Sequence, residues 1–224
     1  FEADLYNEQA AAMGRTEAPI AHFVGHPLLD STTPSRSAAD TRARYGLDAE
    51  RPLLVLLPGS RHKEIESLLP DFIVAAQQLQ AQGWQVALAQ AHTISRADID
   101  QACGGHSLDI PVVEHDTYNL VHAADAVIAA SGTATLESAL LGTPVVITYR
   151  VSPFTYALAR RLVRVDHIGM PNIILGRRVF PEFIQDAITP TALATAVQEV
   201  FTHKADFADA CAEFRAQLGE PGAP

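Results

Sequence analysis

The chain has 224 residues, of which 48% are hydrophobic and 19% charged, so it can bury a substantial core as one or two domains. Its formal net charge of −10 argues against nucleic acid as the main partner, because that binding needs a basic face. Its apolar runs are far shorter than the roughly 20 residues that span a bilayer. Cys103 and Cys211 are isolated, match no redox or metal motif, and suit a reducing compartment.

Short apolar runs alternate with amphipathic patterns along the first two thirds of the chain. Strands are expected at 21–24, 53–57, 84–90, 110–114, 125–130 and 144–149. Helices are expected at 36–45, 64–82, 95–103, 117–124 and 133–142, with Gly83 ending the second of these. This alternation predicts an α/β fold, with a Rossmann-like parallel sheet and helices on both faces.

The pattern changes after Arg150. Residues 167–176 form an apolar stretch that predicts a loop or a short strand, with the polar Asn172 in its middle. A buried asparagine needs hydrogen-bond partners, so Asn172 is either satisfied by backbone groups or directed at a ligand. Further helices are expected at 180–185, 190–202 and 204–218, before a loose tail.

Residues 150–178 form a locally basic segment in this acidic chain. Part of it, following Pro153, predicts an amphipathic helix. Such a surface suits anionic lipid headgroups or phosphorylated substrates, although a solvated helix face explains it equally well. The segment has six arginines and one acid, Asp166; the arginines are Arg150, Arg160, Arg161, Arg164, Arg177 and Arg178.

The first turn with features of a phosphate site follows the apolar run 53–57. Gly59 permits a tight turn, Ser60 offers a hydroxyl group, and Arg61 offers a planar fork of donors for phosphate oxygens. A Pro-Gly-Ser turn before basic residues is also common without any ligand. The second turn therefore decides between these interpretations.

The second turn, Ser131-Gly132-Thr133-Ala134, joins an apolar strand to a helix. Small residues let backbone N–H groups approach a ligand, and the positive end of the helix dipole then favours a phosphate. Glu137 lies one turn into the helix, where its carboxylate can accept two hydrogen bonds from a ribose diol. The alternative is an ordinary strand-to-helix turn that Thr133 caps. Two such turns at the carboxyl ends of predicted strands favour a nucleotide-like ligand.

The ordered motifs FVGHPLLD at 23–30, LLPGSRHKEI at 56–65 and the stretch 130–185 resemble the lipid-A-disaccharide synthases. These are glycosyltransferases with two Rossmann domains, the GT-B architecture. The resemblance implies that the chain is the C-terminal, donor-binding half of such an enzyme. Residues 1–30 would be a connector from an N-terminal domain, 31–185 the UDP-sugar-binding domain, and 186–224 C-terminal helices and the tail.

The resemblance also implies an activity. Such an enzyme joins UDP-2,3-diacylglucosamine to 2,3-diacylglucosamine 1-phosphate, releases UDP, and works on the cytoplasmic side of the inner membrane, peripherally on its anionic surface. It needs no cofactor or metal, and the nine histidines show no metal-ligand spacing. The catalytic base is expected in the N-terminal domain, so this chain alone would be inactive.

By the same resemblance, Glu137 would hold the ribose, Pro171 and Asn172 would lie near the donor, and Arg61 would stabilise the leaving UDP. The diphosphate would lie at Gly59, Ser60, Arg61, Ser131, Gly132, Thr133 and Ala134. Another GT-B enzyme, such as a UDP-GlcNAc 2-epimerase or a peptidoglycan-precursor transferase, is the first alternative. A non-catalytic nucleotide-sugar-binding module is the second. The sequence leaves a homo-oligomer open.

Overall fold

The computed structural model describes residues 2–15, 19–104, 109–152, 155–156 and 167–222. Its strands are β1 Leu53–Leu57, β2 Gln85–Gln90, β3 Val112–Glu114, β4 Ala126–Ala130, β5 Val145–Tyr149 and β6 Glu182–Ile184. Its helices are α1 Glu2–Ala12, α2 Leu28–Ser31, α3 Ala38–Arg44, α4 His62–Gln80, α5 Arg96–Ala102, α6 Thr117–His122, α7 Thr133–Leu140, α9 Met170–Leu175, α10 Pro190–Thr202 and α11 Lys204–Gln217, with a 3₁₀ turn at Gln185–Ala187.

The strands form one six-stranded sheet in the order β3-β2-β1-β4-β5-β6, and every neighbouring pair is parallel. The strand order reverses between β1 and β4, so the chain winds outward in both directions from this point. In open α/β sheets, the crevice at such a switch point is where ligands bind. The expected Rossmann-like parallel sheet is therefore confirmed, with five of its strands at the predicted places.

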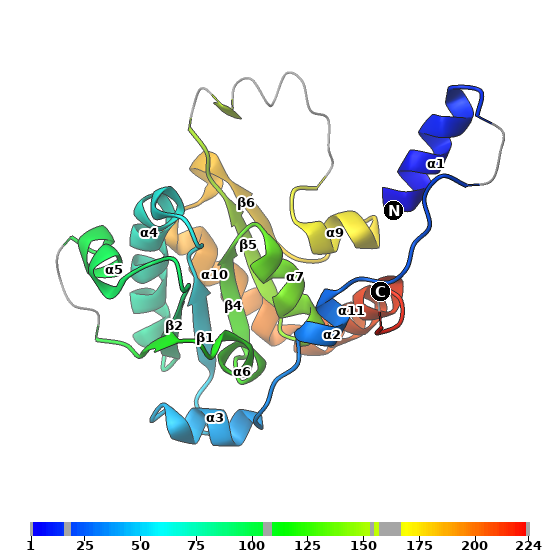
Figure 1. The fold of residues 1–224 in the computed structure, drawn as a ribbon. Coiled ribbons are helices and arrows are strands. Elements are labelled where there is room, and N and C mark those ends of the chain that lie inside the picture. Colours follow the sequence, from blue (N-terminus) through cyan, green and yellow to red (C-terminus); the bar gives the residue numbers. More distant parts are fainter. Residues whose placement is uncertain (1, 16–18, 105–108, 153–154, 157–166, 223–224) are drawn as a thin grey trace.

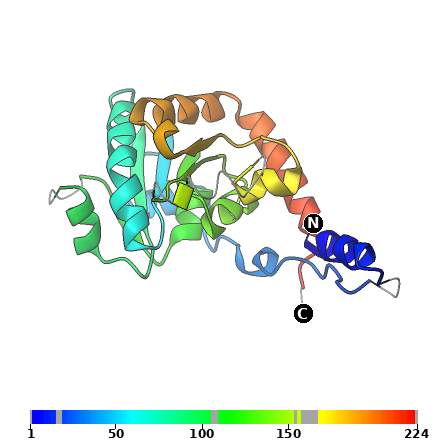
Figure 2. The ribbon, with the colours of Figure 1, turned by 90° about the horizontal axis from the view of Figure 1, so that it is seen from above.

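Both faces of the sheet are covered (Figures 1 and 2). Alternate residues of β1 belong to different cores: Leu54 and Leu56 pack in the core that contains α4 and α10, whereas Val55 packs in the core that contains α7 and α11. Successive side chains of a strand point to opposite faces, so a strand covered on both sides must be apolar throughout. This explains why the central strands are continuous apolar runs.

Helix α4 follows its predicted pattern closely. Ile65, Leu68 and Phe72 are buried along one face. Beyond its end, Gly83 has a φ of +93°, and the N–H of Trp84 donates to the carbonyl of Leu79 at 3.1 Å. A left-handed glycine satisfies the last carbonyls of a helix in this way.

Three predictions of secondary structure are wrong. Residues 21–24 are not a strand; the N–H and carbonyl of Ala21 instead bond the side chain of Asn7, at 3.0 and 2.9 Å. The stretch 167–176 contains helix α9, which has a proline in its first turn and Gly176 at its end in the left-handed conformation. Residues 182–184, expected within a helix, form β6, which pairs with the free edge of β5.

The two C-terminal helices pack on opposite faces of the sheet, one in each core. Leu193 and Val197 of α10 pack with α4, while Phe214 of α11 packs on the opposite face. The N–H of Gly222 donates to Asp30 at 2.9 Å, which fastens the C-terminal tail to helix α2. Helix α1 projects from this body in both views (Figures 1 and 2). Among the described helices, none is both long and apolar enough to cross a membrane.

Candidate functional site

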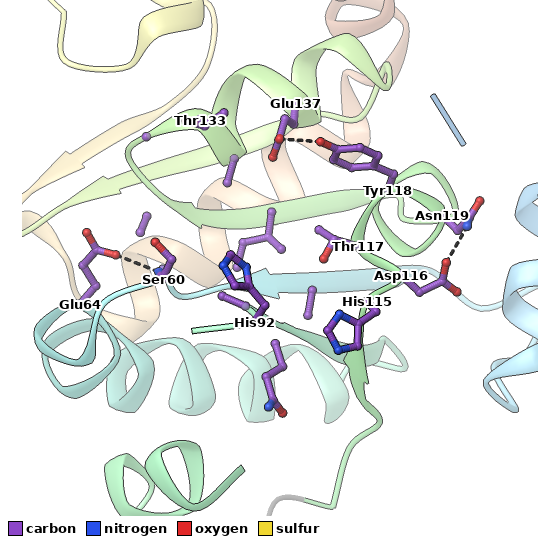
Figure 3. Close-up of a pocket in the computed structure, with 18 of the residues that line it drawn as sticks. Ser60, Glu64, His92, His115, Asp116, Thr117, Tyr118, Asn119, Thr133 and Glu137 are labelled. Atoms are coloured by element: carbon purple, nitrogen blue, oxygen red, sulfur yellow. Dashed lines mark hydrogen bonds between the residues drawn. The ribbon is translucent and has the colours of Figure 1, made fainter. Parts of the chain in front are cut away.

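A pocket of about 740 Å³ lies at the carboxyl ends of β1, β2 and β4, over the switch point of the sheet (Figure 3). The structure brings both predicted turns and Glu137 to this pocket, although about 70 residues separate the turns in sequence. The predicted site residues that line it are Gly59, Ser60, Arg61, Ser131, Gly132, Thr133, Ala134 and Glu137. Pro171 and Asn172 do not line it.

The first turn requires a glycine. Gly59 has a φ of +118°, a conformation that residues with a side chain rarely adopt. A Cβ at this position would lie 2.7 Å from the Cβ of Glu64, which is closer than side-chain carbons approach. Glu64 folds back over the turn and leaves no room for a side chain at position 59.

The carboxylate of Glu64 occupies the donors of this first turn (Figure 3). Its Oε2 accepts the backbone N–H groups of Ser60 at 2.9 Å and Arg61 at 3.2 Å, and its Oε1 accepts the Arg61 guanidinium at 2.9 Å. These two backbone donors at the start of α4 already have an anionic partner, as in a capping box. The side chains of Ser60 and Arg61 still line the pocket, and that of Arg61 is 82% exposed.

The second turn differs because no side chain in the described part of the chain caps it. Gly132 is the N-cap of α7, with a φ of +156°, and makes no side-chain capping bond. The N–H of Ser131 continues the sheet by donating to Thr148 at 2.7 Å. Within the described residues, the N–H groups of Gly132, Thr133 and Ala134 donate to no protein group. These donors at the positive end of a helix dipole suit an anion.

Glu137 also lines the pocket, one turn into α7. The hydroxyl of Tyr118, from α6, donates to its Oε1 at 2.8 Å, and Figure 3 shows the two side chains pointing toward each other. Among the described residues no other group donates to this carboxylate. Glu137 therefore keeps acceptor capacity for a ligand hydroxyl.

Several lining residues were not expected from the sequence. His92 follows β2, and His115 and Asp116 follow β3, so the parallel ladder brings them to the same edge as the two turns. Their position just after predicted strands was the sequence pattern that could have indicated them as lining residues. His115 has a φ of +57°, which is uncommon for a residue with a side chain and directs the turn into α6.

Asp116 is held in a network at the border of the pocket. It accepts hydrogen bonds from Arg36, Tyr45 and Asn119. Burial alone would raise the pKa of Asp116, but the hydrogen bonds from Asn119 and Tyr45 and the charge of Arg36 outweigh it, so the pKa lies below its ordinary value. Asp116 is therefore ionised at neutral pH and engaged by its own neighbours.

Asn172 is fully buried and fully satisfied. Its amide donates to the Phe180 carbonyl at 2.8 Å and to Glu182 at 2.7 Å, and its oxygen accepts the N–H groups of Val179 and Phe180, both at 2.9 Å. Of the two roles that the sequence left open, the structure gives it the structural one. Asn172 closes the loop between α9 and β6 instead of entering the pocket.

The described arginines of the basic segment have protein partners. Arg150 pairs with Asp71 at 2.7 Å, Arg177 pairs with Glu213 at 2.6 Å, and Arg178 donates to the Glu182 carbonyl at 2.9 Å. The three arginines expected to contact lipid, Arg160, Arg161 and Arg164, lie outside the described residues.

In the described part of the chain, no three His, Cys, Asp or Glu side chains come together as metal ligands. A metal-free reaction stays a prediction.

A family model described as lipid-A-disaccharide synthetase matches residues 1–220. This chain belongs to the lipid-A-disaccharide synthetase family. The lipid-A-disaccharide synthase of Geobacter sulfurreducens is 42% identical over 199 residues, covering 88% of this chain and 50% of that protein. The Myxococcus xanthus enzyme is 38% identical over 228 residues, covering 100% of this chain and 57% of that protein.

The chain thus spans about half the length of these relatives. Solved glycosyltransferases share its fold. A Rickettsia africae glycosyltransferase has a TM-score of 0.57 at 12% identity, covering 96% of this chain and 56% of that one. Anabaena HepE, solved in complex with UDP-glucose, has a TM-score of 0.51 at 15% identity, covering 83% of this chain and 48% of that one. The fold is that of one half of a GT-B glycosyltransferase.

Proposed function

We propose that this chain is the donor-binding half of an enzyme that transfers a diacylglucosamine unit from UDP-2,3-diacylglucosamine to 2,3-diacylglucosamine 1-phosphate. The observation that carries the proposal is the convergence of two glycine turns and Glu137 on one pocket, in a chain of this family. UDP is the released product, and the lipid A disaccharide with its β-1,6 bond is the other.

The N–H groups at the start of α7, which donate to no described protein group, and the Arg61 guanidinium suit the diphosphate, and Glu137 suits the ribose diol. In the reaction, the 6-hydroxyl oxygen of the acceptor attacks the anomeric carbon of the donor while the bond from that carbon to UDP breaks. The hydroxyl proton passes to a base that we assign to the N-terminal half. Negative charge develops on the departing diphosphate, and preorganised donors that face it lower the barrier.

Both lipid substrates reside in a membrane, so we further propose that the enzyme works peripherally on the inner membrane, facing the cytoplasm. Arg160, Arg161 and Arg164 would contact anionic headgroups, each contact contributing about 1 kcal/mol at modest salt. Co-sedimentation with anionic vesicles should fall for the variant with all three changed to Gln, and for the native chain at high salt. Equal sedimentation of the two proteins at low salt would refute this contact.

Calorimetric titration tests the donor site directly. UDP should bind the native chain. Glu137→Gln should weaken the binding of UDP more than that of 2′,3′-dideoxy-UDP, which lacks the diol. UDP-GlcNAc and an acylated UDP-glucosamine complete the series and report on the sugar and the acyl chains. No heat of binding for UDP, from a chain that circular dichroism shows to be folded, would overturn the proposal.

Activity gives a second test. Residues 1–224 alone should not transfer sugar, because the base and the acceptor site are assigned to the other half. Transfer by the purified chain, above a control without protein, would contradict this division of labour.

A further inference from the structure

The hydrogen bond between Tyr118 and Glu137 joins two helices at the pocket. Tyr118 lies in the first turn of α6 and Glu137 lies in α7, and both side chains line the pocket. The phenol hydroxyl donates to Oε1 at 2.8 Å, which leaves Oε2 without a donor among the described residues. One carboxylate oxygen is thus fixed by the protein while the other remains available.

Helix α6 is itself firmly anchored, so the direction of the Tyr118 hydroxyl is well defined. The neighbouring Asn119 is 5% exposed, and its oxygen accepts the backbone N–H groups of Ser35 at 2.8 Å and Arg36 at 2.9 Å. Its amide donates to Asp116 at 2.6 Å, at the start of the same helix (Figure 3). Leu120 is buried in the core beneath. Tyr118 therefore projects from a fixed support.

A glutamate side chain has three rotatable bonds, and its terminal torsion is broad, so an unsupported carboxylate samples many orientations. Binding a vicinal diol requires two acceptor oxygens in a defined plane. A donor on one oxygen restricts the carboxylate before the ligand arrives, which lowers the entropy lost on binding. Each carboxylate oxygen has two lone pairs, so Oε1 can accept from Tyr118 and from a ligand hydroxyl together.

We propose that Tyr118 is a positioning residue that orients Glu137 to accept both hydroxyls of the ribose of a nucleoside diphosphate. This inference rests on the proposed function and names a residue that acts through Glu137. The phenol remains a donor over the neutral range: burial raises the pKa of Tyr118, and its hydrogen bond to Glu137 and the charge of that carboxylate raise it further.

A purely structural role, as a brace between α6 and α7, makes a different prediction. A brace contributes to the stability of the fold, so its loss affects every ligand of the pocket equally. A positioning role affects only ligands that carry the diol. Selectivity between UDP and 2′,3′-dideoxy-UDP therefore separates the two roles.

The test is calorimetric titration of both ligands into the native chain and Tyr118→Phe, which keeps the ring and removes only the donor. Tyr6→Phe is the matched control, because Tyr6 lies on α1 and is 57% exposed. Tyr118→Phe should weaken UDP about threefold to tenfold, the usual scale for one hydrogen bond, and leave 2′,3′-dideoxy-UDP unchanged. Tyr6→Phe should change neither. In a Glu137→Gln background, Tyr118→Phe should have no further effect on UDP.

Equal weakening of both ligands, or unchanged UDP affinity, in a Tyr118→Phe protein with native circular dichroism would overturn the positioning role while leaving the donor site intact. If Tyr118→Phe weakened UDP binding as much in the Glu137→Gln background as in the native chain, the positioning role would be overturned as well, because Tyr118 would then act independently of Glu137. Absence of UDP binding by the native chain would overturn both this inference and the proposed function.

Discussion

Asp125 ties together three parts of the domain, and its replacement should reveal how much that junction contributes to stability. Its Oδ2 accepts the Arg42 guanidinium at 2.7 Å and the backbone N–H of Leu53 at 3.0 Å. Its Oδ1 accepts the Lys204 ammonium at 2.8 Å. Asp125 thereby connects α3, the first residue of β1 and the first residue of α11.

The size of the effect follows from the burial of each partner. The side chains of Asp125 and Arg42 are 14% and 11% exposed, so theirs is a largely buried pair, and breaking such a pair costs roughly 3–5 kcal/mol. Lys204 is 57% exposed and adds little. In Asp125→Asn the amide oxygen can still accept a hydrogen bond from the Leu53 N–H, and Arg42 keeps its hydrogen bonds to four backbone carbonyls. We therefore expect a loss of about 2–3 kcal/mol, below the full range.

The effect should depend on pH in a defined direction. Burial alone would raise the pKa of Asp125, but Lys204, the Leu53 N–H and Arg42 outweigh it and hold the pKa below the ordinary value of an aspartate. A group with a lowered pKa in the folded state stabilises the fold above its unfolded pKa. That contribution is lost as the pH falls through the folded pKa. The native chain should therefore lose this stabilisation below about pH 4, and Asp125→Asn should lack that component.

Urea unfolding followed by circular dichroism, at pH 7 and in steps down toward pH 3, measures both effects. Asp209→Asn is the matched control, because Asp209 is exposed on α11 and should change the free energy of unfolding by less than about 0.5 kcal/mol. If Asp125→Asn is as stable as this control at pH 7, or if the difference between native and variant persists undiminished at pH 3, the junction does not act as described.

Further predictions concern the two turns and the cysteines. Gly59→Ala should lower the free energy of unfolding by about 2 kcal/mol or more in urea titrations, because backbone strain at a positive φ and a clash with Glu64 add. Gly142→Ala is the control: its φ is +78° and the space around it is open, so it should suffer the backbone strain alone. Arg61→Ala should weaken UDP by about 1.5 kcal/mol in calorimetry, the low end for a charged donor, since the side chain is largely exposed; unchanged affinity would exclude this contact. With a thiol reagent at pH 8, Cys103 should react first, because burial raises the pKa of Cys211 to about 12. Equal rates would contradict that burial.

Much of the site could be predicted from the sequence because its parts are local. A glycine after an apolar strand, or a carboxylate one turn into a helix, places backbone and side chain within a few residues. The strands Leu53–Leu57 and Ala126–Ala130 are continuous apolar runs, and parallel pairing then brings their ends to one edge. The positions of Gly59, Gly132 and Glu137 at one pocket follow from these patterns alone.

Other features were decided only when distant segments met. Residues 182–184 form a strand because the free edge of β5 supplies their backbone partners, and a local pattern cannot reveal that edge. Asn172 could have faced a ligand, but Glu182 and the backbone of Phe180 saturate its amide. Glu64 likewise bonds the backbone N–H groups of Ser60 and Arg61 in the first turn, so these two donors are not free for a phosphate. The sequence determined which groups could bind an anion, and the tertiary structure decided which of them remain free, because a buried polar group bonds whatever partner the fold brings within reach.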